Sequence, residues 1–220
     1  MTSFERARTD EQRAQRVQHI LAIAEQMLTE MPVAQVTLNE LSRRVGLAKS
    51  NVLRYFPSRE AVLLHLLDQH MQAFLDGVAT DLPADRHPAD IADVVARQAA
   101  GRPTFCDLLA NSTSVLERNV STEVAARAKR ASLTAGHRLA RAAGFAGMGD
   151  PAGLLFVAAT TLSITGMWTT CQPTEAMQEV YRLDPELAAV RPDFETSVRE
   201  LVLTGLLGIQ ARFGQPSTAA

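Results

Sequence analysis

The segment GLAKSNVLRYF, residues 46–56, holds the residues whose types and spacing point most directly to chemistry. Glycine, lysine and serine in this order could form a loop that binds a nucleotide phosphate, or the segment could be the turn and second helix of a DNA reader. A phosphate-binding P-loop needs a glycine directly before its lysine and another glycine five residues earlier. Those positions hold Ala48 and Arg43, and no strand-like β-branched run precedes the segment, as one does before a P-loop. The spacing therefore excludes the nucleotide site.

Two short helices are predicted on either side of Gly46. The first begins after Thr37, because a threonine followed three residues later by Glu40 is typical of a capping box. Gly46 ends it, since glycine commonly stands where the chain leaves a helix in a left-handed conformation. The second helix, predicted over residues 48–55, turns Val52 inward and presents amide, hydroxyl and basic side chains outward: Lys49, Ser50, Asn51 and Arg54. This is the design of a helix-turn-helix, whose second helix fits the major groove of DNA.

The stretch from Val36 to Met71 resembles the DNA-binding region of the TetR (tetracycline-repressor) family of bacterial transcriptional regulators. The resemblance is carried by the threonine cap, the glycine turn, the aromatic pair at 55–56, and Pro57-Ser58 followed by a basic residue and Glu60. It covers about residues 10–75, and the remaining two thirds resemble the family only as a helical array of the right length. The periodicity alone would fit an ordinary helical hairpin with a solvated basic edge equally well. The order of the motif residues is what favours a DNA-binding segment.

The resemblance implies which side chains contact DNA. Bases would be read by Lys49, Ser50 and Asn51, and the phosphates would be held by Thr37, Arg54, Tyr55 and Arg59, with Arg44 as a further backbone contact. An arm beside the minor groove would consist of Arg6, Arg8 and Arg13. One position departs from the family, because Leu53 stands where an aromatic residue often contacts phosphate. The departure leaves open an alternative, a dimeric adaptor whose helix-turn-helix no longer binds DNA.

Beyond the motif the sequence shows helical signals and no alternating strand pattern, which predicts an all-α fold. A first amphipathic helix is expected to open with a capping box at Thr9 and to end near Pro32, and a long helix follows Ser58. Later helices are predicted over residues 87–100, 103–119, 121–143, 151–171 and 193–213. The segment 173–192 is predicted as loop with one short helical turn. The expected organisation is a three-helix DNA-binding domain over 1–57, a larger helical ligand-binding and dimerisation domain over 58–213, and a disordered tail over 214–220.

Two late helices, predicted over residues 151–171 and 194–213, have the composition of a dimer interface. The helix over 151–171 is apolar on nearly all faces and carries small residues that allow close helix contact: Gly153, Ala158, Ala159 and Gly166. Family members dimerise through their last two long helices, so the resemblance implies a homodimer and a palindromic operator. The alternative is that the helix forms the core of a single chain. The helix is a poor membrane span, because its apolar stretch is only about 17 residues long and contains four hydroxyl side chains. We therefore expect a buried helix instead.

The middle helices are expected to enclose a pocket for a small effector. Candidate lining residues are Met71, Phe74, Phe105, Leu109, Asn111, His137 and Trp168. Most of these residues could equally belong to an ordinary core, and a satisfied core hydrogen bond is the alternative explanation for the polar members Asn111 and His137. The prediction is a ligand-responsive transcriptional regulator, a repressor released from its operator by a mainly apolar molecule. Activation stays open, because the sign depends on where the operator lies relative to the promoter.

Composition and the absence of other motifs argue against several other classes of protein. The chain has 220 residues, 46% of them hydrophobic, which is ample for a globular core. No apolar stretch follows the charged start, so the expected location is the cytoplasm. Cys106 and Cys171 lack metal-site spacing and are expected to be buried thiols. Residues 1–60 hold 9 basic and 7 acidic residues in a chain of net charge −2, so the positive part is the amino-terminal one. No hydrolase, metalloprotease or dinucleotide motif occurs, and neither enzyme activity nor a cofactor is expected.

Overall fold

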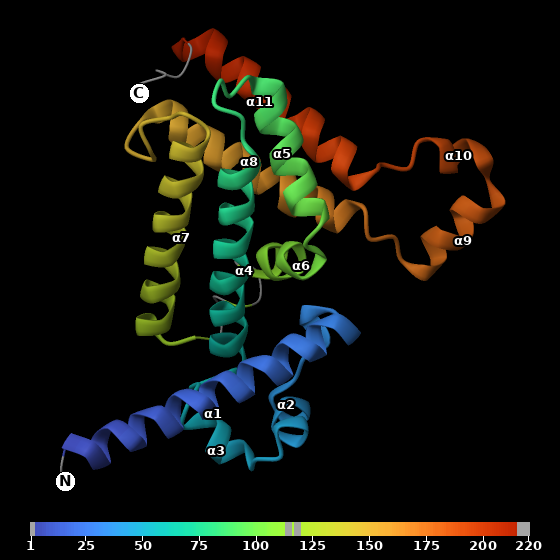
Figure 1. Cartoon of the computed structure of the whole chain (residues 1–220). Coiled ribbons are helices and arrows are strands. Elements are labelled where there is room, and N and C mark those ends of the chain that lie inside the picture. The colour runs from blue at the N-terminus through green and yellow to red at the C-terminus, as the bar shows by residue number, and fades with distance from the viewer. Residues whose placement is uncertain (1–2, 113–115, 117–119, 215–220) are drawn as a thin grey trace. The chain divides into compact units, whose positions relative to one another are not determined.

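A computed structural model describes residues 3–112, 116 and 120–214 (Figure 1). These residues form helices joined by loops, with no strand among them, which confirms the all-α prediction. The described residues divide into two compact units, one from 1–69 and 111–128 and the other from 70–110 and 129–220. The units are groups of mutually packed residues rather than linear segments. The domain boundary between residues 57 and 58 therefore stays a prediction, and the predicted disordered tail after Gly214 lies outside the described residues.

The first unit holds the elements of the helix-turn-helix. They are α1 (Ser3–Glu30), the 3₁₀ turn η1 (Val33–Gln35), α2 (Leu38–Val45), α3 (Lys49–Leu53) and the start of α4 (Arg59–Asp81). Helix α1 ends before Pro32 as predicted, but the predicted start at Thr9 is wrong. The residues before Thr9 include neither proline nor glycine, so nothing stops the helix from extending upstream. The core of the unit is apolar and includes Ile20, Ala24, Met27, Leu41, Val52 and Leu63.

The second unit is a helical array in which α11 packs on two other helices. Its elements are α5 (Pro88–Ala100), α6 (Pro103–Asn111), α7 (Thr122–Ala142), α8 (Pro151–Thr170), α9 (Glu175–Leu183), α10 (Pro185–Ala189) and α11 (Phe194–Phe213), and α4 and α7 have residues in both units. Both α5 and α8 pack on α11, whose buried side chains recur at three- and four-residue steps: Val198, Val202, Leu206 and Ile209. Helix α6 ends at Asn111, and the rest of the predicted helix to residue 119 lies largely outside the described residues.

The segment between α8 and α11 corrects the prediction of a loop with one helical turn, because it contains the two helices α9 and α10. Thr174 caps α9 by accepting a hydrogen bond from the N–H of Met177 at 3.3 Å. Asp184 caps α10 by accepting from the N–H groups of Glu186 and Leu187 at 3.0 and 3.2 Å. A proline follows Asp184 in the first turn, where its missing N–H costs nothing. Both caps are visible in the sequence, and they mark helix starts.

Helix α8 is not the buried helix that the sequence predicted. Only 33% of its most apolar window is buried within the chain, although the helix is long and apolar enough by composition to cross a membrane. The inward face carries Phe156, Thr160 and Ile164. The outward face exposes large apolar side chains: Leu154, Leu155 and Leu162. The alternative of a central core helix in a single chain is therefore wrong.

The two cysteines differ in their surroundings. Cys106 is fully buried, and desolvation raises the pKa of its thiol to about 12, which keeps it protonated and unreactive. Cys171 is only half-buried, so the prediction of two buried thiols holds for Cys106 alone. The Sγ of Cys171 lies 3.5 Å from the carbonyl oxygen of Pro192, and this contact joins the residue that follows α8 to the segment just before α11.

We expect Gly153→Ala to destabilise the second unit. A Cβ at residue 153 would lie 2.3 Å from the carbonyl oxygen of Gly147 and 3.1 Å from Cβ of Phe145. The oxygen belongs to the backbone, so no side-chain rotation relieves the clash, and overpacking of this kind costs about 1–3 kcal/mol. Urea unfolding followed by circular dichroism should show a lower midpoint. The matched control is Gly149→Ala, whose added Cβ meets nothing within 4 Å, and equal midpoints for the two variants would contradict the packing described for α8.

Candidate nucleic-acid interface

The turn between α2 and α3 has the geometry that the sequence predicted. Thr37 Oγ1 accepts a hydrogen bond from the N–H of Glu40 at 3.2 Å and so caps α2. Gly46 has φ 72° and ψ 28°, the left-handed region that favours glycine. The N–H of Leu47 then donates to the carbonyl oxygen of Ser42 at 3.1 Å, which closes the end of α2. A Cβ at residue 46 would meet no atom within 4 Å, so backbone conformation alone accounts for the glycine.

Helix α3 presents nearly all its side chains to solvent. It covers only Lys49–Leu53, shorter than the predicted 48–55, and Val52 is its single buried residue. Just after it, Phe56 is buried and meets His65 edge to face, with ring centroids 6.0 Å apart. The predicted DNA-contacting side chains of the helix are all exposed: Lys49, Ser50, Asn51 and Arg54. Within the described part of the chain these four side chains make no hydrogen bond or ion pair, so their donors and acceptors can reach a ligand.

Two of the other predicted contact residues hold neighbouring elements together. The guanidinium of Arg13, on α1, lies over the ring of Tyr55, 5.5 Å from its centroid. Arg59 donates from Nη1 to the carbonyl oxygen of Val36 at 2.6 Å and from Nε to Glu60 at 3.0 Å, which joins the start of α4 to the residue before the α2 cap. Ser58 Oγ accepts from the N–H of residue 61 at 3.1 Å, so the predicted cap of α4 is confirmed.

The predicted minor-groove arm starts within a helix. Residues 3–10 belong to α1, whereas the side chains of Arg6 and Arg8 lie outside the described residues. Arg13 is exposed and stacks on Tyr55 as described. The contribution of all three arginines to DNA binding stays a prediction.

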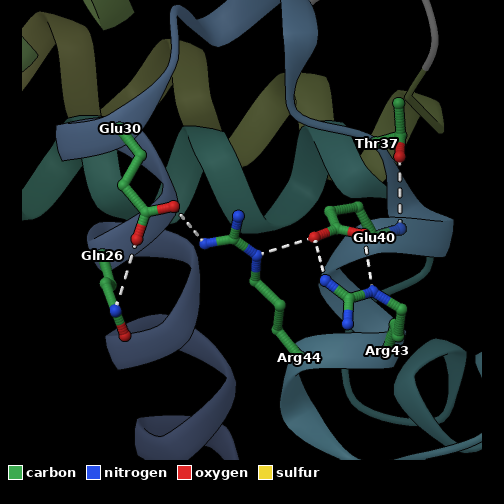
Figure 2. Close-up of polar contacts among 6 residues, drawn as sticks. All are labelled: Gln26, Glu30, Thr37, Glu40, Arg43 and Arg44. Carbon is green, nitrogen blue, oxygen red and sulfur yellow. Dashed lines mark hydrogen bonds and ion pairs between the residues drawn. The ribbon is translucent and has the colours of Figure 1, made fainter.

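A cluster of ion pairs joins α1 to α2, and Figure 2 shows its members around Glu40. The Glu40 carboxylate accepts from Arg43 at 2.6 and 2.9 Å and from Arg44 at 2.8 Å. Arg44 also donates from Nη1 to Glu30, the last residue of α1, at 2.5 Å. The hydrogen bonds from Arg43 and then Arg44 lower the pKa of the Glu40 carboxyl to about 2. Spacings of three and four residues made the pairs within α2 visible in the sequence, but nothing in it pointed to the pair with Glu30.

The cluster changes the role of Arg44. The sequence assigns it a DNA backbone contact, and in the structure its guanidinium is shared between two carboxylates, with only 23% of its side chain exposed. A phosphate would have to compete with both. The contact with DNA stays a prediction, whereas Lys49 and Arg54 are the cations of α3 and its cap that no described carboxylate neutralises.

The structure brings together two of the predicted effector-pocket residues. The rings of Phe74 and Phe105 stack with centroids 4.9 Å apart and are buried in the second unit. Trp168 instead meets Phe194 edge to face at 5.6 Å. His137 is exposed, and its Nδ1 accepts a hydrogen bond from the N–H of residue 148 at 3.0 Å, which satisfies that nitrogen without a ligand. The remaining members are partly buried: Met71, Leu109 and Asn111. The pocket as a whole stays a prediction.

Comparison with known proteins matches both parts of the chain. Residues 20–66 match the family model described as "Bacterial regulatory proteins, tetR family", and residues 68–213 match the model "Tetracyclin repressor-like, C-terminal domain". The HTH-type transcriptional regulator EthR of Mycobacterium tuberculosis (strain ATCC 25618 / H37Rv) is 44% identical over 50 residues, 23% of each chain. EthR of Mycolicibacterium smegmatis is 33% identical over 69 residues, 30% of this chain and 32% of its own length. The matched region therefore spans less than a third of these curated relatives.

A solved structure extends the likeness to the whole fold. The crystal structure of a TetR transcriptional regulator from Rhodococcus sp. RHA1 superimposes with a TM-score of 0.56, covering 90% of this chain and 98% of that one. Sequence identity is 20%, so the comparison establishes the shared fold alone.

We expect Glu40→Gln to lower stability in a pH-dependent way. The pKa of Glu40 falls from 4.5 to about 2 on folding, so the charged carboxylate stabilises the folded chain fully above pH 4.5 and loses this contribution as the pH falls toward 2. Urea midpoints of wild type and variant should differ most near neutral pH and converge as the pH is lowered from 4.5 toward about 2. A difference that stays constant across this range would show that the ion pairs around Glu40 do not stabilise the fold.

Proposed function

Since the chain belongs to the TetR family of bacterial transcriptional regulators and is a helix-turn-helix DNA-binding protein, we propose that it is a homodimeric repressor that leaves a palindromic operator when a small, mainly apolar effector binds. Members of this family are transcription factors, not enzymes. The observation that carries the proposal is the exposure of four polar side chains on and beside α3, directly after the turn at Gly46.

The proposed reading of DNA follows from the chemistry of these side chains. Asn51 can pair with adenine through its amide, and Lys49 can donate to guanine acceptors in the major groove. Ser50 donates or accepts with either kind of base edge. Arg54, at the end of the helix, is positioned for a phosphate, because a contact there fixes the register of the helix without reading sequence. These roles rest on the geometry of the motif and on its resemblance to the family. We infer that the chain binds its operator in the cytoplasm, where bacterial DNA lies.

The proposed dimer uses the outward faces of α8 and α11. These helices pack on each other, and both expose leucines: Leu154, Leu155, Leu162, Leu201 and Leu207. Leu162 is 70% exposed. Exposed leucines in such number, on two helices that pack on each other, mark an interaction surface, and two copies related by a two-fold axis would bury them in a four-helix interface. A dimer carries one α3 in each subunit, so it would bind a palindromic operator with the two α3 helices in successive major grooves, about 34–36 Å apart.

The proposed effector response rests on the buried aromatic residues of the second unit. Phe74 lies on α4, the helix that begins directly after the DNA-binding motif and continues into the second unit. Its stacking partner Phe105 lies on α6. A molecule that binds among these side chains in only one arrangement of the two α4 helices would shift the dimer toward that arrangement. The apolar character of this region supports a mainly apolar effector, and repression follows where the operator overlaps a promoter.

Two substitutions on the exposed side of the motif separate affinity from sequence reading. Arg54→Ala should weaken binding to all DNA and reduce the slope of log affinity against log salt by about 1, because one phosphate contact is lost. Asn51→Ala should mainly relax sequence preference, with about 1–3 kcal/mol less discrimination at one base pair. Both are measured by fluorescence anisotropy on operator and shuffled DNA over a salt series.

The control for these variants is Arg182→Ala, which removes an exposed arginine from α9 and should leave DNA binding unchanged. If Arg54→Ala and Asn51→Ala also bound both DNAs as wild type does, the assignment of α3 as the recognition helix would be wrong. The alternative of an adaptor with an idle DNA-binding motif, suggested by Leu53, would then be favoured.

We expect Leu162→Glu to shift the protein from dimer to monomer. Its side chain is exposed in the single chain, so the fold should tolerate the carboxylate, whereas a buried charge at the interface carries a large desolvation cost. Sedimentation velocity over a concentration series reports the change. The matched control is Leu133→Glu, which makes the same substitution at a leucine of α7 that is 44% exposed. Dimerisation of Leu162→Glu equal to that of the control would exclude α8 from the interface.

A further inference from the structure

Residues 172–192, called the arm below, leave α8 and return to α11 through the two short helices α9 and α10. Figure 1 shows α9 and α10 projecting from the ends of α8 and α11. Every residue of the arm is described, and none in α9 or α10 is buried. The two helices pack on each other, and the guanidinium of Arg191 lies 5.8 Å from the ring centroid of Tyr181. The arm is therefore a surface element that the rest of its own chain does not cover.

The arm holds its shape through local interactions. Side-chain caps at Thr174 and Asp184 satisfy N–H groups at the start of α9 and α10. Where the arm leaves α8 and returns to α11, the Sγ of Cys171 contacts the carbonyl oxygen of Pro192 at 3.5 Å and so links the two ends of the arm. Short helices without tertiary packing are marginal in water even when well capped. The caps favour helix formation in the arm, but stable helices there require packing against another apolar surface.

That face is apolar on one side and charged on the other. At about 100° per residue, Met177, Val180 and Leu183 of α9 share one side. Leu187 of α10 and Val190, the residue after α10, add two more exposed apolar side chains to the arm. Leu183 is 65% exposed and Val190 is 75% exposed. The opposite side of α9 carries polar residues: Glu175, Gln178, Glu179 and Arg182, the last two joined in an ion pair. Exposed aliphatic side chains on one side of a capped helix mark a surface that binds another apolar face.

We propose that the apolar side of the arm packs on a second copy of this chain, so that each subunit of the dimer holds its partner with its own arm. The inference rests on the dimer proposed above. The arm is continuous with α8 and α11, the helices whose exposed leucines form the proposed interface. A two-fold axis through that interface would give two equivalent arm contacts for each dimer.

Charge argues against a lipid surface as the occupant of this face. The arm carries four acidic and two basic residues. Helices that lie on bacterial or other anionic membranes carry lysine and arginine around the apolar side, since these are attracted to the lipid headgroups. The acidic border of the arm would be repelled by such a surface, whereas it is compatible with a protein surface.

The test compares two double variants that change net charge by the same amount. Leu183→Glu with Val190→Glu adds two negative charges to the apolar side, and Gln178→Glu with Arg182→Gln makes the same change on the polar side. Sedimentation velocity on the full chain should give a dimer dissociation constant at least tenfold higher for the apolar-side variant and one close to wild type for the control. Circular dichroism checks that both variants keep their helical content.

A photo-crosslinking amino acid provides a second readout that does not destabilise the arm. Placed at Leu183, it should yield a covalent dimer of the full chain under ultraviolet light, and placed at Gln178 it should yield little. If wild type dimerises, the apolar-side variant dimerises equally well and position 183 gives no covalent dimer, the arm inference is overturned while the proposed dimer of α8 and α11 stands. If wild type is monomeric at all concentrations, the proposed dimer itself fails and the arm contact with it.

Discussion

The orientation of α3 depends on one left-handed residue, Gly46. The helix is five residues long and has a single buried side chain, Val52, so its own packing could not fix the direction in which its polar side chains point. The turn at Gly46 and the hydrogen bond from Leu47 to Ser42 fix that direction by tying α3 to α2. An L-residue with a side chain is strained at this conformation. Because of the turn, α3 can leave most of its side chains exposed and still have a defined position.

Among the basic residues of the first unit, some join its helices to one another and others are exposed without an ion pair. Arg44 and Arg59 are held by carboxylates and a backbone carbonyl, and they join α1, α2 and α4 to one another. Arg13 stacks on Tyr55. Lys49 and Arg54 make no ion pair among the described residues, which leaves their charge available for DNA phosphates and base edges. A motif with a net charge of only a few units can therefore still offer positive charge to DNA, since these two cations lie on the exposed side of the proposed recognition helix.

The local parts of this architecture could be predicted from the sequence, and the parts set by long-range contact could not. Thr37, Gly46 and Ser58 act through bonds to residues within a few positions, so their patterns predicted the caps and the turn correctly. The sequence prediction does not include α9 and α10, although Thr174 and Asp184 give similar signals, because the prolines at 173, 185 and 192 favour loop. The pair of Arg44 with Glu30 spans fourteen residues and left no pattern. The apolar composition of α8 predicted burial, but burial in the single chain covers only one face, and composition does not distinguish a core from an interface.

An anisotropy titration at near-physiological salt shows whether the exposed side of α3 reads a particular DNA sequence. The purified chain is titrated against DNA from upstream of its own gene, against the preferred site recovered by random-sequence selection, and against shuffled DNA of equal length. If α3 reads sequence, at least one specific site should bind roughly a thousandfold more tightly than shuffled DNA. Equal, weak binding to all three DNAs, with no site enriched by the selection, would contradict it.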